Sequence, residues 1–168
     1  AKKLGYKPNK AARALKANKS KMIGVVNPNM SNPFFAHITK AIVEHSQKLG
    51  YDVLVFDSYE SASFENKAIQ TLIEHGVDGI ILSTISSDMN YQPEYLVDLS
   101  ENEIPFVLLD RELLGEYNGV YIDNMDSGYQ LGRLIAQEFN TDNKIHILAA
   151  ADNSMVSNNR IAGFRAAL

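Results

Sequence analysis

Short apolar runs recur along the chain, separated by segments in which apolar residues return every three or four positions. Short uncharged apolar runs are typical of strands that are buried on both faces of a sheet, and the segments of helical spacing between them are typical of the helices that cover those faces. The runs that predict strands lie at 22–26, 53–56, 79–82, 106–109, 120–122 and 145–148. The helical spacing predicts amphipathic helices over about 35–49, 68–75 and 131–139. Gly50 and Gly76 directly follow the first two of these helices, at the position where helices commonly end.

This alternation predicts an α/β fold, a doubly wound parallel sheet with helices on both faces. In such a sheet, ligands bind beyond the carboxyl ends of the strands. Mostly polar residues follow the predicted strands, at 27–35, 57–58, 83–84, 110–111, 123–124 and 150–154. Loops are polar in most proteins. It is therefore the recurrence of polar groups at one edge of the sheet that indicates a binding site.

Several kinds of chemistry find no support in the sequence. The chain of 168 residues contains no cysteine, which excludes disulfides and thiolate metal sites. It has no glycine-rich phosphate-binding motif and no nucleophile elbow. The histidines are scattered rather than paired four residues apart; they are His37, His45, His75 and His146. We therefore expect no enzyme, catalytic residue, metal or cofactor. We also expect no membrane partner, because no uncharged apolar run approaches ~18 residues and no signal-peptide core is visible.

The polar residues that follow the predicted strands suit a neutral polyol better than a nucleotide. Asp110 could accept hydrogen bonds from two hydroxyl groups, and Arg111 could donate to neighbouring oxygens. Phe34 or Phe35 could cover an apolar face of a sugar ring, and Asn32 offers both a donor and an acceptor. The same residues also fit a surface ion pair and a packing pair at the start of a helix. The residues alone leave both interpretations open.

Basic residues are concentrated at the beginning of the chain. The first 43 residues hold nine lysines and arginines and no acid, whereas the remainder holds seven basic and twenty acidic residues. The remainder thus carries a balance of −13 within an overall net charge of −4. A basic arm on an acidic body indicates contact with a polyanion. Charge alone fits a solvated, lysine-rich linker equally well.

Several motifs occur in an order that is characteristic of one protein family. They are Leu4-Gly-Tyr-Lys-Pro-Asn-Lys-Ala-Ala-Arg-Ala-Leu15, Ile23-Gly-Val-Val26, Ser31-Asn-Pro-Phe-Phe35, Gly50-Tyr-Asp-Val53, Val77-Asp-Gly-Ile-Ile-Leu82, Ile104-Pro-Phe-Val107, Asp110-Arg111, Asp123-Asn124 and Arg160-Ile-Ala-Gly-Phe164. Through them the chain closely resembles the LacI/GalR family of bacterial transcription regulators over nearly its whole length. Periplasmic sugar-binding proteins share the motifs from Ile23 onward but lack the segment from Leu4 to Leu15.

The resemblance implies a piece of a longer protein, with a helix-turn-helix before Leu4 and the rest of a second sensor lobe after Leu168. It implies a sensor with a periplasmic-binding-protein-like fold of type I, preceded by a hinge helix. The implied divisions are a linker and hinge helix at 1–21, an N-terminal sensor lobe at 22–123, and the start of a C-terminal lobe at 124–168.

The family's hinge helix corresponds to Pro8 through Lys16. A helix of about nine residues is too short to hold in water, so it would form as two copies pack in a widened minor groove. Leu15 matches the leucine that such repressors insert between base pairs; the alternative is that Leu15 packs against the sensor lobe. The implied DNA contacts are Pro8, Asn9, Lys10, Arg13, Leu15 and Lys16.

The resemblance implies effector contacts at Asn32, Phe34, Phe35, Asp110, Arg111, Asp123 and Arg160, with Asn124 next to them. The implied effector is a small sugar or sugar phosphate, foremost a pentose or similar sugar. The implied protein is a cytoplasmic homodimer whose affinity for operator DNA depends on that sugar. The main alternative is an extracytoplasmic sugar-binding receptor of an ABC transporter, which would need an export signal and would have no use for the segment from Leu4 to Leu15. An enzyme of the doubly wound class is a second alternative.

Overall fold

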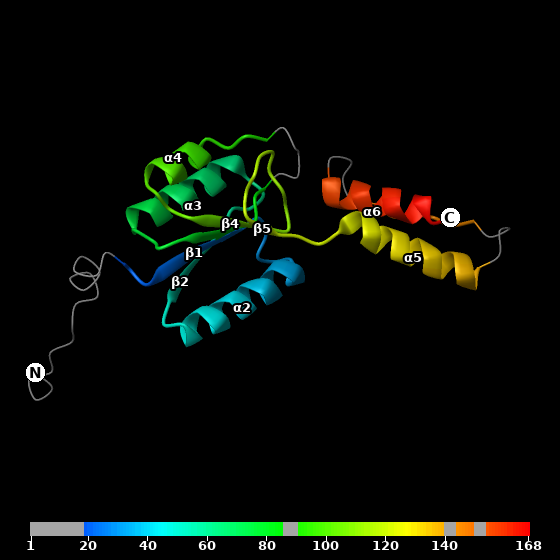
Figure 1. Ribbon diagram of the computed structural model, residues 1–168, viewed down its shortest axis with the longest axis horizontal. Helices are drawn as coiled ribbons and strands as arrows, with labels where there is room; N and C mark the ends of the chain where they lie inside the picture. The colour runs from blue at the N-terminus through cyan, green and yellow to red at the C-terminus, as the bar shows by residue number, and fades with distance from the viewer. Residues whose placement is uncertain (1–18, 86–90, 140–143, 150–153) are drawn as a thin grey trace, which may run out of the picture. The chain divides into compact units, whose positions relative to one another are not determined.

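The computed structural model describes residues 19–85, 91–139, 144–149 and 154–168 (Figure 1). The chain divides into two compact units. Unit 1 comprises Ala1–Ile85 and Pro93–Val107, and unit 2 comprises Ser86–Gln92 and Leu108–Leu168. The predicted DNA contacts lie outside the described residues; they are Pro8, Asn9, Lys10, Arg13, Leu15 and Lys16. The lobe boundary predicted near residue 123 stays a prediction.

The described strands form a five-stranded sheet with the strand order β2-β1-β3-β4-β5. Its strands are β1 (Met22–Asn27), β2 (Asp52–Asp57), β3 (Ile80–Leu82), β4 (Phe106–Leu109) and β5 (Gly119–Val120). β1 pairs in parallel with β2 and β3, and β4 pairs in parallel with β5. The predicted α/β class with a parallel sheet is therefore confirmed.

Three helices belong to unit 1: α2 (Pro33–Lys48), α3 (Ala62–Glu74) and α4 (Tyr95–Glu101). Figure 1 shows α2 on one face of the sheet and α3 and α4 on the other. Their apolar faces enclose a core; its fully buried members include Val25, Val26, Ile69, Leu72, Leu82 and Leu99. Gly24 of β1 lets α3 pack closely, because a Cβ there would lie 2.4 Å from the Leu72 side chain.

α2 begins at Pro33, two residues before the start that the apolar spacing predicts. Asn32 is the N-cap, with its side-chain oxygen accepting from the Phe34 amide at 3.0 Å, and Pro33 occupies the first helical position. Both features are typical helix starts, because these positions have no amide partner within the helix. Gly50, at φ +78°, follows the end of the helix. The predicted stop is therefore confirmed.

A polar group is buried in unit 1 beneath the end of β3. Glu65, in the first turn of α3, is fully buried. Its carboxyl group accepts hydrogen bonds from the Thr84 hydroxyl (3.2 Å), the Ile85 amide (2.6 Å) and the Tyr95 hydroxyl (2.7 Å). Glu65 thereby joins α3 and α4 to the residues that leave β3.

Unit 2 contains a closely packed helix pair, α5 (Asn124–Glu138) and α6 (Met155–Ala166). A Cβ at Gly128 of α5 would lie 1.9 Å from the carbonyl oxygen of Arg160 on α6. A Cβ at Gly163 of α6 would lie 1.9 Å from the carbonyl oxygen of Met125 on α5. The two helix backbones are thus in direct contact, and only glycine fits at these positions.

Two predicted strands need correction, and two helices were not predicted. The predicted strand at 145–148 is wrong, because residues 144–149 have no regular structure and Leu148 is fully exposed. A strand needs a neighbour, and none of the described strands pairs with this segment. β5 ends at Val120, so Tyr121 and Ile122 lie beyond it. The helices α4 and α6 are present although the apolar spacing did not predict them.

Candidate functional site

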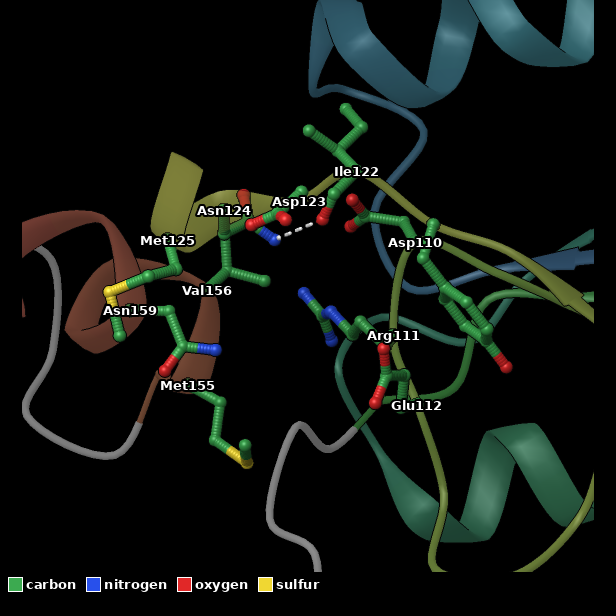
Figure 2. Close-up of a pocket in the computed structure, with 11 residues that line it drawn as sticks. Asp110, Arg111, Glu112, Ile122, Asp123, Asn124, Met125, Met155, Val156 and Asn159 are labelled. Carbon is green, nitrogen blue, oxygen red and sulfur yellow. Dashed lines mark hydrogen bonds between the residues drawn. The ribbon is translucent and has the colours of Figure 1, made fainter. Parts of the chain in front are cut away.

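A pocket of about 340 Å³ lies within unit 2 (Figure 2). Its walls come from the residues after β4, the residues after β5 with the start of α5, and the first turns of α6. The lining residues are Asp110, Arg111, Glu112, Tyr121, Ile122, Asp123, Asn124, Met125, Met155, Val156 and Asn159. Three of the predicted effector contacts, Asp110, Arg111 and Asp123, are therefore brought together here.

Asp110 sits in a tight turn at the end of β4. Its φ angle is +67°, and the Arg111 amide donates to the Leu109 carbonyl oxygen at 2.8 Å across it. Residues other than glycine seldom adopt this conformation, although aspartate tolerates it better than most. The Asp110 amide donates to the Val120 carbonyl oxygen of β5 at 2.9 Å, which holds the turn in place. Strained backbone that is fixed in this way is a feature of binding sites.

The electrostatics of the pocket are dominated by carboxyl groups. Burial raises the pKa of Asp110, against the opposite effect of the Arg111 and Arg160 charges. Burial, and then the charge of Glu112, raise the pKa of the Tyr121 hydroxyl. Figure 2 shows the side chains of Asp110 and Arg111 reaching into the pocket. The site therefore offers hydrogen-bond acceptors and a planar cationic donor in one half-buried space.

Asp123 and Asn124 begin α5 and form the wall next to α6. Asp123 is the N-cap, and its carboxylate accepts from the Asp126 amide at 2.8 Å. Asn124 is 9% exposed, and its amide nitrogen donates to the Ile122 carbonyl oxygen at 3.1 Å. Its side-chain oxygen accepts from Nε of Arg160 at 2.8 Å. One side-chain oxygen of Asp123 and the side-chain oxygen of Asn124 thus already accept hydrogen bonds from the protein.

Arg160 stands beside this pocket rather than in its lining. It lines a second hollow of about 550 Å³ in unit 2, between α5, α6 and the apolar residues 145–148. Its bond to Asn124 and its effect on the pKa of Asp110 still connect it to the first pocket. Within the structure, Arg160 thus positions Asn124.

The remaining predicted contacts, Asn32, Phe34 and Phe35, belong to unit 1. They follow β1 and form the start of α2. The two phenylalanine rings meet edge to face, with centroids 5.1 Å apart. Phe35 is buried in the core, whereas Phe34 is 36% exposed. Of this pair, only Phe34 presents a ring at the surface of unit 1.

Several lining residues were missed by the sequence analysis. Glu112 directly follows the Asp-Arg pair, so its place in the chain could have suggested it. Tyr121 falls within a predicted strand, which hid its contribution. Met155, Val156 and Asn159 lie on α6, a helix without a clear apolar repeat. They could be found only from the packing of α6 on α5.

Two negative observations apply to the residues that the structure describes. Over 19–85, 91–139, 144–149 and 154–168, no three histidine or acidic side chains are grouped closely enough to hold a metal ion. Within these same ranges, no helix has both the length and the apolar character required to cross a bilayer.

Comparison with known families identifies the fold that carries this pocket. Residues 23–168 match the periplasmic binding protein domain, which covers the described strands and helices except for Met22, the first residue of β1. The chain belongs to this family. Among solved structures, this periplasmic binding protein domain is similar to an ABC transporter solute-binding protein from Mycobacterium smegmatis with bound glycerol. The TM-score is 0.79 and the identity 23%, over 87% of this chain and 51% of that one, which is a likeness of fold.

Curated relatives of this domain include transcriptional regulators. The chain is 29% identical to the HTH-type transcriptional regulator DegA of Bacillus subtilis, over 98% of this chain and 48% of that protein. It is 31% identical to the ribose operon repressor of Lactococcus lactis, over 95% of this chain and 45% of that protein. The chain thus spans about half the length of the curated relatives it matches. The expected similarity to LacI-type regulators is confirmed.

Proposed function

We propose that this chain is part of a transcriptional regulator whose affinity for operator DNA is controlled by a small neutral sugar. The observation that carries the proposal is the pocket at Asp110 and Arg111, in a chain whose curated relatives include an operon repressor. A pocket of about 340 Å³ is within the usual range for small-molecule sites. The proposal assigns the chain a binding role and no catalysis.

The charge of the lining favours an uncharged ligand over a sugar phosphate. Three carboxyl groups and one guanidinium group line the pocket: Asp110, Glu112, Asp123 and Arg111. A phosphate would meet more negative than positive charge there, whereas hydroxyl groups would find acceptors and a donor. The similar solute-binding protein that holds glycerol shows a polyol bound to this fold. A pentose or similar sugar is the ligand we propose.

Further contacts to the sugar are proposed from the order of motifs along the chain. Asn32, Phe34 and Phe35 follow β1, as Asp110 and Arg111 follow β4, and binding beyond the carboxyl ends of strands is the rule for parallel sheets. In the proposal, Phe34 covers an apolar ring face, Asn32 bonds a hydroxyl, and Phe35 supports Phe34. Arg160 acts on the ligand directly or through Asn124.

On the DNA side, we propose that the basic segment contacts the minor groove as a pair of hinge helices in a homodimer. Leu15 would enter between base pairs, while Pro8, Asn9, Lys10, Arg13 and Lys16 would lie along the backbone. Sugar and DNA affinity are then linked reciprocally, since each ligand stabilises the state that it binds better. Coupling of this kind typically amounts to about 1–3 kcal/mol.

The ligand half of the proposal is tested by calorimetry on the full-length protein with a panel of pentoses and their phosphates. A neutral pentose is expected to bind, and Asp110→Asn is expected to weaken it by about tenfold to a hundredfold, the loss of one charge-assisted hydrogen bond. Glu138→Gln, an exposed carboxyl elsewhere on α5, is the matched control. Unchanged affinity in Asp110→Asn, or binding of phosphates only, contradicts the assignment.

The DNA half is tested by operator binding with and without the bound sugar. Leu15→Ala is expected to weaken operator binding while leaving the sugar affinity unchanged. A full-length protein that binds the sugar but shows no affinity for any duplex would overturn the regulator proposal. That outcome would instead favour a sugar receptor that serves a transporter.

A further inference from the structure

The chain enters β1 through a joint formed by Ser20 and Lys21, far from the sugar pocket in the sequence. Asp78, between α3 and β3, accepts hydrogen bonds there with both carboxylate oxygens. Its Oδ1 accepts from the Ser20 amide at 2.7 Å and from the Ser20 hydroxyl at 2.9 Å. Its Oδ2 accepts from the Lys21 amide at 3.1 Å. Two consecutive backbone amides and one side chain are thus bound to one carboxylate.

Lys21 is held from two further sides. Its carbonyl oxygen accepts from the Asp52 amide at 2.9 Å, and its ammonium group lies 4.3 Å from the centre of the Tyr51 ring. Its φ angle is +58°, an uncommon conformation for a lysine. The Met22 amide donates back to the Ser20 hydroxyl at 3.2 Å. The backbone therefore makes a defined turn immediately before β1 begins.

Other hydrogen bonds hold β1 in the sheet. β1 pairs with β2 from Met22 to Asn27 and with β3 from Gly24 to Val26, and the Asp78 amide donates to the Met22 carbonyl oxygen at 2.8 Å. What the Asp78 side chain adds is a fixed position for Ser20 and Lys21, the two residues before Met22. That preceding chain is the basic segment, with eight lysines and arginines in its first 21 residues.

We infer that Asp78, Ser20 and Lys21 form a joint that fixes the direction in which the basic segment leaves unit 1 and thereby raises its affinity for DNA. The three are positioning residues, since they act on the segment and touch neither the sugar pocket nor, in this assignment, the bases. The DNA part of the inference rests on the proposed function. The part that concerns direction is argued from the bonds that hold Ser20 and Lys21 and does not depend on the proposed function.

The ionisation of Asp78 agrees with this geometry. Burial by itself would raise its pKa, but the hydrogen bonds from Ser20 and Lys21 and the charge of Lys19 outweigh burial, so the pKa of Asp78 is lowered. The carboxylate therefore stays charged and keeps both oxygens as acceptors at neutral pH.

The direction of the segment is measured by spin-label distances; these 168 residues contain no cysteine, and any cysteine elsewhere in the full-length protein is first replaced by serine. Labels at Ala17→Cys and at Gln47→Cys on α2 report the segment against unit 1 of the full-length protein. Ser20→Ala and Asp78→Asn are expected to broaden the distance distribution about twofold, since one or two backbone residues regain their freedom. Ser20→Thr keeps the hydroxyl and is expected to restore the narrow distribution. Equal widths in all variants overturn the joint.

The effect on DNA is measured in the same full-length variants without labels. Ser20→Ala and Asp78→Asn are expected to bind DNA about tenfold more weakly, because the segment must then be ordered on binding. Their sugar affinity is expected to be unchanged, which also verifies that they are folded. Glu74→Gln removes an exposed carboxylate next to the same loop and controls for the change in charge.

The outcomes separate this inference from the proposed function. Broadened distances with unchanged DNA affinity would overturn the role of the joint in binding DNA. If the unsubstituted protein binds no DNA, the proposed function fails, and the label distances still decide whether the joint fixes the segment. Weaker DNA binding in Glu74→Gln of the same size as in Asp78→Asn would assign the effect to charge and reject the inference.

Discussion

Replacing Glu65 by alanine is expected to destabilise unit 1 more than any surface substitution in the same helix. Glu65 is fully buried, and its carboxyl group accepts from Thr84, Ile85 and Tyr95. The substitution removes the hydrogen-bond acceptor that these three groups share. Tyr95 and Thr84 are themselves buried, so water cannot readily replace the lost bonds.

The size of the effect follows from the two fully buried donors. A buried donor that loses its partner costs about 1–3 kcal/mol, and the Ile85 amide, which is only partly buried, costs less. The losses of the two buried donors and the smaller loss at Ile85 add up, and the space left by the removed side chain adds to them. We therefore expect Glu65→Ala to lower the free energy of unfolding by about 3–5 kcal/mol. Tyr95→Phe removes one hydroxyl from a ring that stays packed, and we expect a loss of about 1–2 kcal/mol.

Urea unfolding followed by circular dichroism measures both values. The double variant is expected to lose about 1 kcal/mol less than the sum of the single losses, since the two groups share one bond. Glu74→Gln, at the exposed end of α3, should change the stability by less than about 0.5 kcal/mol. A loss below about 1 kcal/mol in Glu65→Ala would refute the reasoning, because the network would then contribute no more than a surface contact.

Three further outcomes are expected. Gly128→Ala should lower the free energy of unfolding by about 1–3 kcal/mol in urea unfolding, because its Cβ would meet the α6 backbone at Arg160. Asn32→Ala should cost about 1 kcal/mol in the same measurement through loss of the α2 cap. Burial raises the pKa of Asp110, so its contribution to stability is fully present below its ordinary value of 3.8 and is lost as the pH rises through the raised value. Asp110→Asn should therefore raise the melting temperature of the sugar-free protein at neutral pH, by an amount that disappears in acid.

Elements that are determined by local sequence were predicted well. The end of α2 was predicted because Gly50 directly follows the last apolar position of the helix. The start at Pro33 lies two residues before the predicted one, because the Asn32 cap and Pro33 are not part of the apolar spacing. β4 matches its predicted bounds because a short apolar run between polar residues is typical of a buried strand. The Asp110-Arg111 pair was found for the same reason, since it directly follows β4.

Features that depend on distant partners could not be predicted. Ile145 to Leu148 read as a strand, but no described strand pairs with them. The turn at Asp110 is held by the carbonyl group of Val120, and the residues next to Asp110 in the sequence do not indicate such a turn. Glu65 stands in the first turn of a helix, where a carboxylate is ordinarily solvated. Its burial follows only from the convergence of α3, α4 and β3.

The glycine contacts between α5 and α6 bear on how the pocket wall responds to an occupant. In most helix pairs, side chains between the axes can change rotamer and absorb a small displacement. Here the main chains touch at Gly128 and Gly163, so no compliant layer separates them. We therefore expect α5 to move together with α6 when a ligand displaces Asn159. We expect adaptation to ligands of different size to come from the flexible thioether side chains of Met125 and Met155, which also line the pocket.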